Sequence, residues 1–271
     1  SEADRGVVGV LCSGCGVRRA AQITHAVQSP TPPYTVLVRI DPHTHSACSD
    51  GTDSPAGLMA QAAAAGLDVV GLTDHDTMAG WQEAARAVPD TGVALLRGTE
   101  ISCAADGVTL HLLSYLHRAD DAGLEAAFAR ARRSRDSRAQ QMVERLSEDY
   151  PLTWEHVQEQ TGEENASVGR PHIADALIAA GIVASREEAF GRILYAGSPY
   201  YVPQESMDPL EATRLVLAAG GVPVVAHPMS ENRGPALPLE YLGQMADAGL
   251  AGIEVYHREN SEPNRARLLE F

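Results

Sequence analysis

Short apolar runs alternate with helical segments along most of this chain, and this alternation limits the folds that it can adopt. The run at 67–73 (LDVVGLT) is almost continuously apolar, as expected of a strand that is buried on both faces. A helix is expected just before it, because Ser54 and Pro55 form a helix-start signal and Gly66 can end the helix. Repeated units of strand and helix predict a parallel sheet, either closed as a barrel or open and doubly wound.

The same patterns place the other elements and divide the chain into three parts. Further strands are expected at about 34–40, 93–96, 108–116, 222–226 and 252–256, and helices at about 78–88, 120–149, 171–180, 185–195, 208–219, 239–248 and from 261 onward. No strand pattern interrupts the helices between 118 and 199, so this stretch is expected to be a helical insertion, or cap. The sheet would use 36–117 and 200–271, and the proline-rich end of 1–35 predicts an extended or disordered leader.

The charge of the chain restricts its partners. A formal net charge of −15 argues against a broad basic surface for duplex DNA. The arginines between 130 and 138 predict a solvated helix face with glutamate partners, and an RNA or phosphate contact surface is the alternative. No apolar run approaches the roughly 20 residues that span a bilayer, and the acidic N-terminus does not resemble a signal peptide. We therefore expect a cytoplasmic protein without membrane contact.

Histidines and acids recur where the expected strands end. His43 and His45 follow an apolar run that ends at Ile40, and alternate side chains of a strand point the same way. Two converging neutral imidazoles suit a divalent metal better than a packed core, although a lone pair could equally be solvated in a turn. Later strand ends carry Asp74-His75-Asp76, Glu100, His111, His227, Glu254 and His257. Because ligand sites form at the carboxyl ends of strands in α/β sheets, the set predicts a site for two or three metal ions.

The segments around these residues resemble a known family. DPHTHSACSDGT (41–52), GLTDHD (71–76), GTE (98–100) and VVAHP (224–228) are together similar to the motifs of the PHP domain, the polymerase and histidinol phosphatase superfamily. The spacing and the helical insertion most resemble its stand-alone phosphoesterases, which act on nucleotides and RNA 5′ ends. The resemblance covers about residues 38–271. It implies a distorted (β/α)7 barrel with a trinuclear centre of divalent ions, first of all manganese, with iron or zinc as alternatives.

The resemblance also implies roles for residues at matching positions. The ions would be bound by His43 and His45 with bridging Glu100, by His111 and His227 with the same Glu100, and by Asp50 with His75. Glu100 and His75 would thus belong to the catalytic machinery. Asp74 would join them by orienting the ring of His75, as ligating histidines usually require.

Three further residues are expected to contact the substrate. Arg170 and His172 lie in the segment GRPHIA, which resembles the substrate-facing stretch of the family's insertion. There Arg170 can grip a phosphate through two N–H groups at once. A plain helix start is an equally good interpretation, because Pro171 follows. His257, beyond the last expected strand, is the third residue.

The implied chemistry is metal-assisted hydrolysis of a phosphomonoester. A hydroxide bound to the metals would attack phosphorus, since a bound cation brings the pKa of its water down to about 7. The substrate would be a nucleoside 3′,5′-bisphosphate, a 5′-nucleotide or a short RNA 5′ end. A histidinol phosphatase is an alternative within the family. An amidohydrolase barrel also begins with paired histidines, but it would need a metal-bridging lysine on a middle strand, and no lysine stands there.

One motif of the family is not found. Its last strand carries Gly-(Ser/Thr)-Asp-x-His, which supplies an aspartate and a histidine to the metals, and no such segment precedes Phe271. The final barrel strand is therefore expected to be missing from this chain. Asp41 and Asp76 are too close to other ligands to replace the aspartate. A truncated fragment that binds metal weakly, or a metal-free scaffold, is the remaining alternative.

Overall fold

A mixed sheet forms the centre of the molecule. The computed structural model describes residues 9–10, 38–105, 107–161, 168–230 and 237–271. In these residues the sheet has the order β1-β7-β6-β5-β4-β3-β2. The strands are β1 (Gly9–Val10), β2 (Ile40–Thr44), β3 (Val69–Leu72), β4 (Ala94–Ala105), β5 (Val108–Tyr115), β6 (Val222–Ala226) and β7 (Gly252–Ile253). The sheet and its helices form a half-barrel, and the predicted α/β class is confirmed.

The sheet is not wholly parallel, and this corrects the prediction. β2, β3 and β4 are parallel neighbours, as are β6 and β7, but β5 runs antiparallel to both β4 and β6. Only two positions separate Ala105 from Val108, which is too few for the crossover that a parallel pair needs. β4 also continues to Ala105, well beyond the predicted end at Leu96. The result is a long hairpin through the middle of the sheet.

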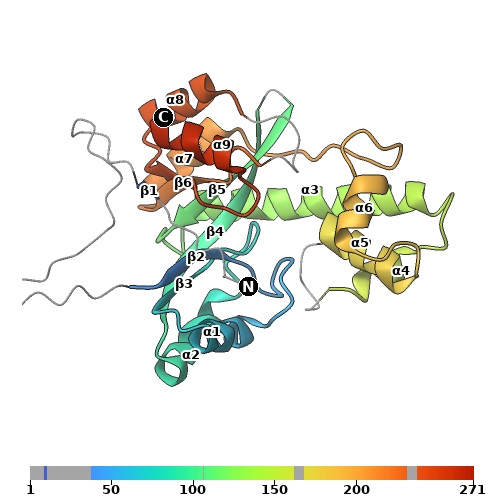
Figure 1. Cartoon of the computed structure of the whole chain (residues 1–271), viewed down its shortest axis with the longest axis horizontal. Helices are drawn as coiled ribbons and strands as arrows, with labels where there is room; N and C mark the ends of the chain where they lie inside the picture. The colour runs from blue at the N-terminus through green and yellow to red at the C-terminus, as the bar shows by residue number, and fades with distance from the viewer. Residues whose placement is uncertain (1–8, 11–37, 106, 162–167, 231–236) are drawn as a thin grey trace, which may run out of the picture.

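Helices cover the sheet and extend away from it. They are α1 (Pro55–Ala64), α2 (Trp81–Thr91), α3 (Ala122–Leu146), α4 (Trp154–Gln158), α5 (Arg170–Ala179), α6 (Arg186–Arg192), α7 (Pro209–Ala218), α8 (Leu239–Asp247) and α9 (Glu262–Glu270). α1 begins as predicted, with the Ser54 hydroxyl accepting a hydrogen bond from the Gly57 amide at 3.1 Å. α1 and α2 lie on one side of the sheet, and α7, α8 and α9 lie on the other (Figure 1).

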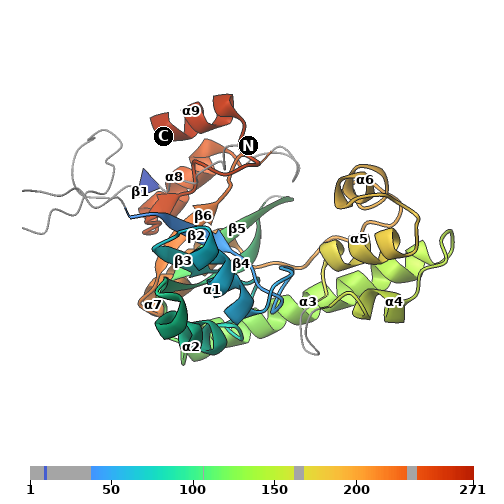
Figure 2. The same cartoon turned by 60° about the horizontal axis from the view of Figure 1, so that its bottom comes forward.

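The helices α3 to α6 have a hydrophobic core of their own. Met142, Leu146, Ile173 and Leu177 are fully buried in this core, which is separate from the cores beside the sheet. The first half of α3 packs against the sheet, where Phe128 joins the main core. The second half carries α4, α5 and α6 away from the sheet (Figure 2). The helix α4 was not predicted.

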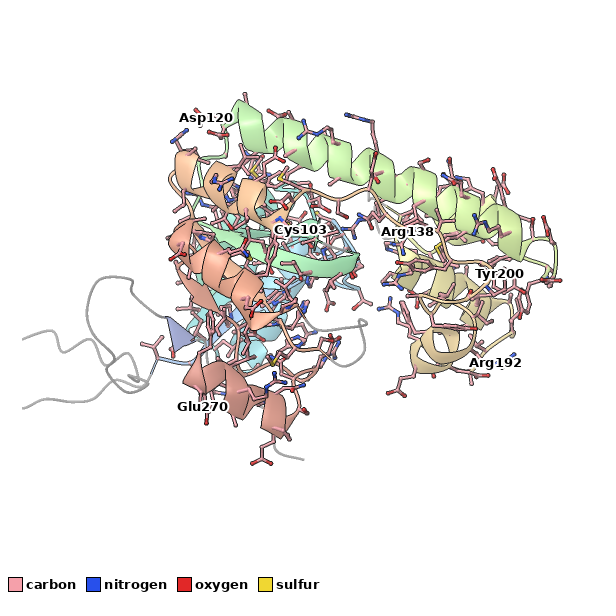
Figure 3. The ribbon with its side chains drawn as sticks, turned by 90° about the horizontal axis from the view of Figure 1, so that it is seen from above. Cys103, Asp120, Arg138, Arg192, Tyr200 and Glu270 are labelled. Atoms are coloured by element: carbon pink, nitrogen blue, oxygen red, sulfur yellow. The ribbon has the colours of Figure 1, made fainter. Side chains whose placement is uncertain are left out.

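The arginines of α3 correct another expectation. Arg135 and Arg138 are buried rather than solvated. Arg135 donates a hydrogen bond to Asp76 Oδ2 at 2.7 Å, and Arg138 donates from Nε to the carbonyl of Val202 at 2.6 Å. Figure 3 shows Arg138 where the helical part faces the sheet. These two side chains therefore attach α3 to the loop after β3 and to the segment that returns to the sheet.

Of the first 37 residues, the structure describes Gly9 and Val10. Apart from β1, which pairs antiparallel with β7, the predicted leader at 1–35 lies outside the described residues. Within the described residues, no helix has both the length and the apolar character needed to cross a membrane.

Candidate metal centre

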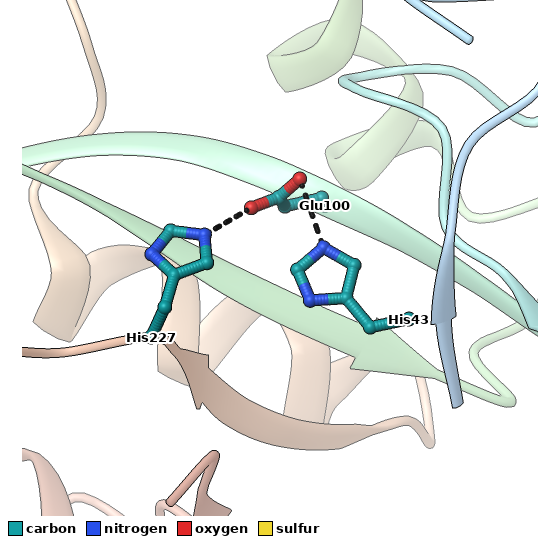
Figure 4. A group of neighbouring side chains, drawn as sticks. All are labelled: His43, Glu100 and His227. Atoms are coloured by element: carbon teal, nitrogen blue, oxygen red, sulfur yellow. Dashed lines mark hydrogen bonds and ion pairs between the residues drawn. The ribbon is translucent and has the colours of Figure 1, made fainter. Parts of the chain in front are cut away.

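The carboxylate of Glu100 stands at the centre of a ring of histidines. Glu100 lies within β4, and its side chain is 1% exposed. On Oε2 the nearest ring nitrogens are His43 Nε2 at 3.2 Å, His45 Nε2 at 3.0 Å and His75 Nδ1 at 3.4 Å; on Oε1 they are His111 Nδ1 at 2.5 Å and His227 Nε2 at 3.1 Å. Figure 4 shows His43 and His227 approaching the two oxygens of Glu100. One buried carboxylate thus faces five imidazoles.

Strand ends bring most of these histidines together. His43 lies in β2, His75 follows β3, and the two strands pair closely because Gly71 has no side chain. A Cβ at Gly71 would lie 1.9 Å from the carbonyl oxygen of Pro42. His227 follows β6 with a φ of +28°, an uncommon backbone conformation of the kind that gathers at functional sites.

His111 reaches the centre in another way. It lies inside β5, opposite Ser102 of β4, so it is not at a strand end. It comes beside Glu100 because β5 is antiparallel to β4. The predicted association of these two residues is therefore seen, but the geometry that produces it was not predicted.

Asp50 also belongs to the centre, beside His45 and His75. Its Oδ1 lies 3.5 Å from His45 Nδ1, and its Oδ2 lies 3.7 Å from His75 Nε2. These atoms lie close enough together to bind one ion, as do those of three further groups: His43–Glu100–His227, His75–Glu100–His111 and His43–Glu254–His257. The structure thus brings together all seven residues predicted as metal ligands.

The charges of the centre balance one another. Burial alone would raise the pKa of Glu100, but His111, His75 and His43 lower it well below its ordinary value. Burial alone would lower the pKa of His43, yet Glu100 and Glu254 raise it to about 10. Without metal, this imidazole therefore carries a proton at neutral pH. A metal ion would have to displace that proton, because only the neutral ring is a ligand.

The residues present fit divalent ions. His75 Nδ1 is buried and, although it lies 3.4 Å from Glu100 Oε2, it makes no hydrogen bond among the described residues. Burial also lowers the pKa of His75 well below its ordinary value, which keeps the ring neutral and ready to ligate. An unsatisfied buried nitrogen is costly unless something binds it. Mixed imidazole and carboxylate donors suit manganese, iron or zinc.

Asp74 does not contact His75 in the predicted way. Its carboxylate accepts hydrogen bonds from the amide and hydroxyl of Ser46, at 2.7 and 2.6 Å, and from the hydroxyl of Ser49 at 2.7 Å. The same Ser49 hydroxyl lies 3.3 Å from His45 Nδ1. Asp74 therefore holds the loop after β2 in place, because that loop folds over the end of β3. Through the Ser49 hydroxyl it supports the ring of His45 rather than that of His75.

Glu254 was predicted as one of the strand-end acids, but not as a metal ligand or a substrate contact, and it lies within the site. It follows β7, and its Oε1 lies 3.2 Å from His43 Nδ1. Its Oε2 accepts a hydrogen bond from the amide of His227 at 2.8 Å, which holds that residue in its unusual conformation. The position of Glu254 at a strand end was the available signal.

A cavity of about 470 Å³ opens over the centre. His257 lines the cavity, and the centroid of its ring lies 5.0 Å from that of His227. Burial lowers the pKa of His257 to about 4. Arg170 and His172 do not line this cavity. The guanidinium of Arg170 lies over the ring of Phe190, and His172 accepts the amide of Gly169 at 3.0 Å. Arg170 begins α5, as the alternative interpretation of this segment expected, and its side chain packs within the helical part.

Comparisons with known proteins agree with this geometry. A family model described as PHP domain matches residues 41–175. The chain is 32% identical to a 5′-3′ exoribonuclease of Haemophilus influenzae over 72% of this chain and 70% of the relative. It is 30% identical to a 3′,5′-nucleoside bisphosphate phosphatase of Chromobacterium violaceum over 81% of this chain and 77% of the relative. A crystal structure from Bifidobacterium adolescentis, with a proposed assignment as a metal-dependent phosphoesterase, superposes with a TM-score of 0.83 at 42% identity, covering 85% of this chain and 82% of that one.

Proposed function

This chain belongs to the PHP domain family, and from that premise we propose that it is a metal-dependent phosphoesterase acting on phosphorylated nucleotides. Nucleoside 3′,5′-bisphosphates are the first candidate substrates, and 5′-nucleotides and RNA 5′ ends are the next. The observation that carries the proposal is the single buried carboxylate of Glu100 shared by five histidines. Two relatives named for such substrates support it.

The metal ions would be two or three in number, with manganese expected first. The residues that would hold them are His43, His45, Asp50, His75, Glu100, His111 and His227. Divalent ions at such a site polarise phosphoryl oxygens and lower the pKa of water. Glu254 would keep His43 and His227 in place. His257, neutral at the cavity wall, would offer a hydrogen bond to the substrate.

The helical part is proposed to act as a cap. The stretch at 118–199 contains α3 to α6, and the separate core formed by the second half of α3 with α4 to α6 supports treating that part as a unit. Arg186 of α6 lines the same cavity as Glu100, so this unit contributes to the wall around the substrate. The cytoplasmic location and the lack of duplex DNA binding stay predictions.

The proposal is tested by phosphate release. With manganese, the protein is expected to release phosphate from adenosine 3′,5′-bisphosphate, and His43→Ala is expected to lower kcat/KM by about 10²-fold or more. His156→Ala, a change at an exposed histidine of α4, is the matched control and should leave the rate within about twofold. Histidinol phosphate and a 5′-phosphorylated oligoribonucleotide are assayed in parallel to rank the substrates. No release from any of them with manganese, iron or zinc would overturn the proposal.

A further inference from the structure

Arg186 is the one residue of the helices α3 to α6 that lines the cavity over the metal centre. It lies at the start of α6, while the candidate metal ligands all come from the sheet and its loops. Its side chain is 42% exposed. Asp50 contributes to a raised pKa of Arg186, after the larger effect of Asp175, so the cation lies within electrostatic reach of the centre.

The guanidinium of Arg186 is held in a fixed orientation. Its Nε donates to Asp175 Oδ1 at 2.6 Å, and its Nη2 donates to Asp175 Oδ2 at 2.5 Å. A guanidinium has five N–H groups, and this fork uses two of them. Among the described residues, no hydrogen bond uses the other three, which lie on Nη1 and on the second hydrogen of Nη2. The edge formed by Nη1 and Nη2 can therefore bind two oxygens of a phosphate.

The cavity has room for more than the reacting group. Its volume of about 470 Å³ lies in the range of sites for whole small ligands. The cavity therefore has room for a substrate whose phosphoester is at the metal centre to extend along the wall toward Arg186. Because Asp175 already orders the arginine, binding there costs less conformational entropy than binding to a free side chain.

We propose that Arg186 binds a second phosphoryl group of the substrate and so makes the enzyme prefer doubly phosphorylated nucleotides. The inference rests on the proposed function and names a determinant of its specificity. The second group could be a ribose phosphate or the phosphodiester that joins the next nucleotide, and both present the same pair of oxygens.

The test compares three substrates that share a 5′-phosphate: adenosine 5′-monophosphate, adenosine 3′,5′-bisphosphate and the dinucleotide pApA. Arg186→Gln is expected to lower kcat/KM for the bisphosphate about ten- to a hundredfold, mostly through KM, and to leave the monophosphate within about threefold. Arg186→Lys should fall between, because it keeps the charge but loses the fork. A selective loss on pApA alone would assign the second group to the phosphodiester.

Arg192→Gln is the matched control. Arg192 lies on the same helix, pairs with Glu188, and lies farther from the sheet than Arg138 (Figure 3). Arg192→Gln should leave kcat/KM unchanged for all three substrates, and thermal unfolding should show that all variants are folded. Equal losses on all substrates, or no loss on any, would overturn the inference. If the wild type hydrolyses none of the three compounds, calorimetric titration measures whether it still binds the bisphosphate more tightly than the monophosphate. The proposed activity and the proposed role of Arg186 can therefore be contradicted independently.

Discussion

Glu100→Gln is expected to lower kcat for phosphate release by at least about 10³-fold. Both oxygens of this carboxylate face imidazole nitrogens. Two of the four candidate ion sites around the centre include Glu100, and the other two include a histidine that contacts it. Glutamine keeps the shape of the side chain but removes the negative charge and one acceptor. The ions would lose their shared ligand, and the nearby histidines would lose the anion that now balances them.

Metal content is measured together with activity for this variant. We expect Glu100→Gln to retain fewer ions per chain than the wild type after equilibration with manganese and gel filtration. Glu240→Gln, at an exposed position of α8, should match the wild type in both measurements. A Glu100→Gln protein with full metal content and a rate within tenfold of the wild type would show that the centre does not depend on this carboxylate.

Arg135→Met is expected to lower the free energy of unfolding by about 3–5 kcal/mol. Its partner Asp76 is fully buried, and the two side chains form an ion pair of 2.7 Å between α3 and the loop after β3. Ser102 also donates to Asp76 from its amide at 2.9 Å and its hydroxyl at 2.7 Å. These two bonds do not replace the lost cation, so the buried carboxylate would lose its ion-pair partner.

Urea unfolding followed by circular dichroism measures this cost. Arg133→Met is the control, because Arg133 is exposed on the same helix, and it should shift stability by less than about 0.5 kcal/mol. In the double variant with Asp76→Asn, part of the loss should be recovered, since the buried charge is gone. Equal effects of Arg135→Met and Arg133→Met would contradict the role given to the ion pair.

The fold class and the gathering of the candidate metal ligands could be predicted because they depend on local patterns. Strand-end positions identified His43, His75 and His227, since the carboxyl ends of neighbouring strands meet at one edge. The direction of β5 could not be read from apolar alternation, which is the same in parallel and antiparallel strands. The direction of β5 follows from the two-residue connection after Ala105, which the structure shows and which is too short for a parallel crossover.

Individual side-chain contacts between distant segments that do not both end strands could not be predicted. A helical pattern shows which arginines of α3 share a face. It does not show that Arg135 donates a hydrogen bond to Asp76, which lies 59 positions away in the sequence. Asp74 was assigned to its neighbour His75, whereas the folded loop brings it to Ser46 and Ser49 instead.

The most direct measurement is the rate of phosphate release as metal is returned to a metal-stripped protein. The full chain is treated with a chelator, dialysed and titrated with manganese, and hydrolysis of adenosine 3′,5′-bisphosphate is followed against the ions bound per chain. We predict less than roughly 1% of the activity in the stripped protein and a rate that rises until about two or three ions are bound. A stripped protein that hydrolyses at the full rate, or one that binds the ions with no gain in rate, would contradict the account.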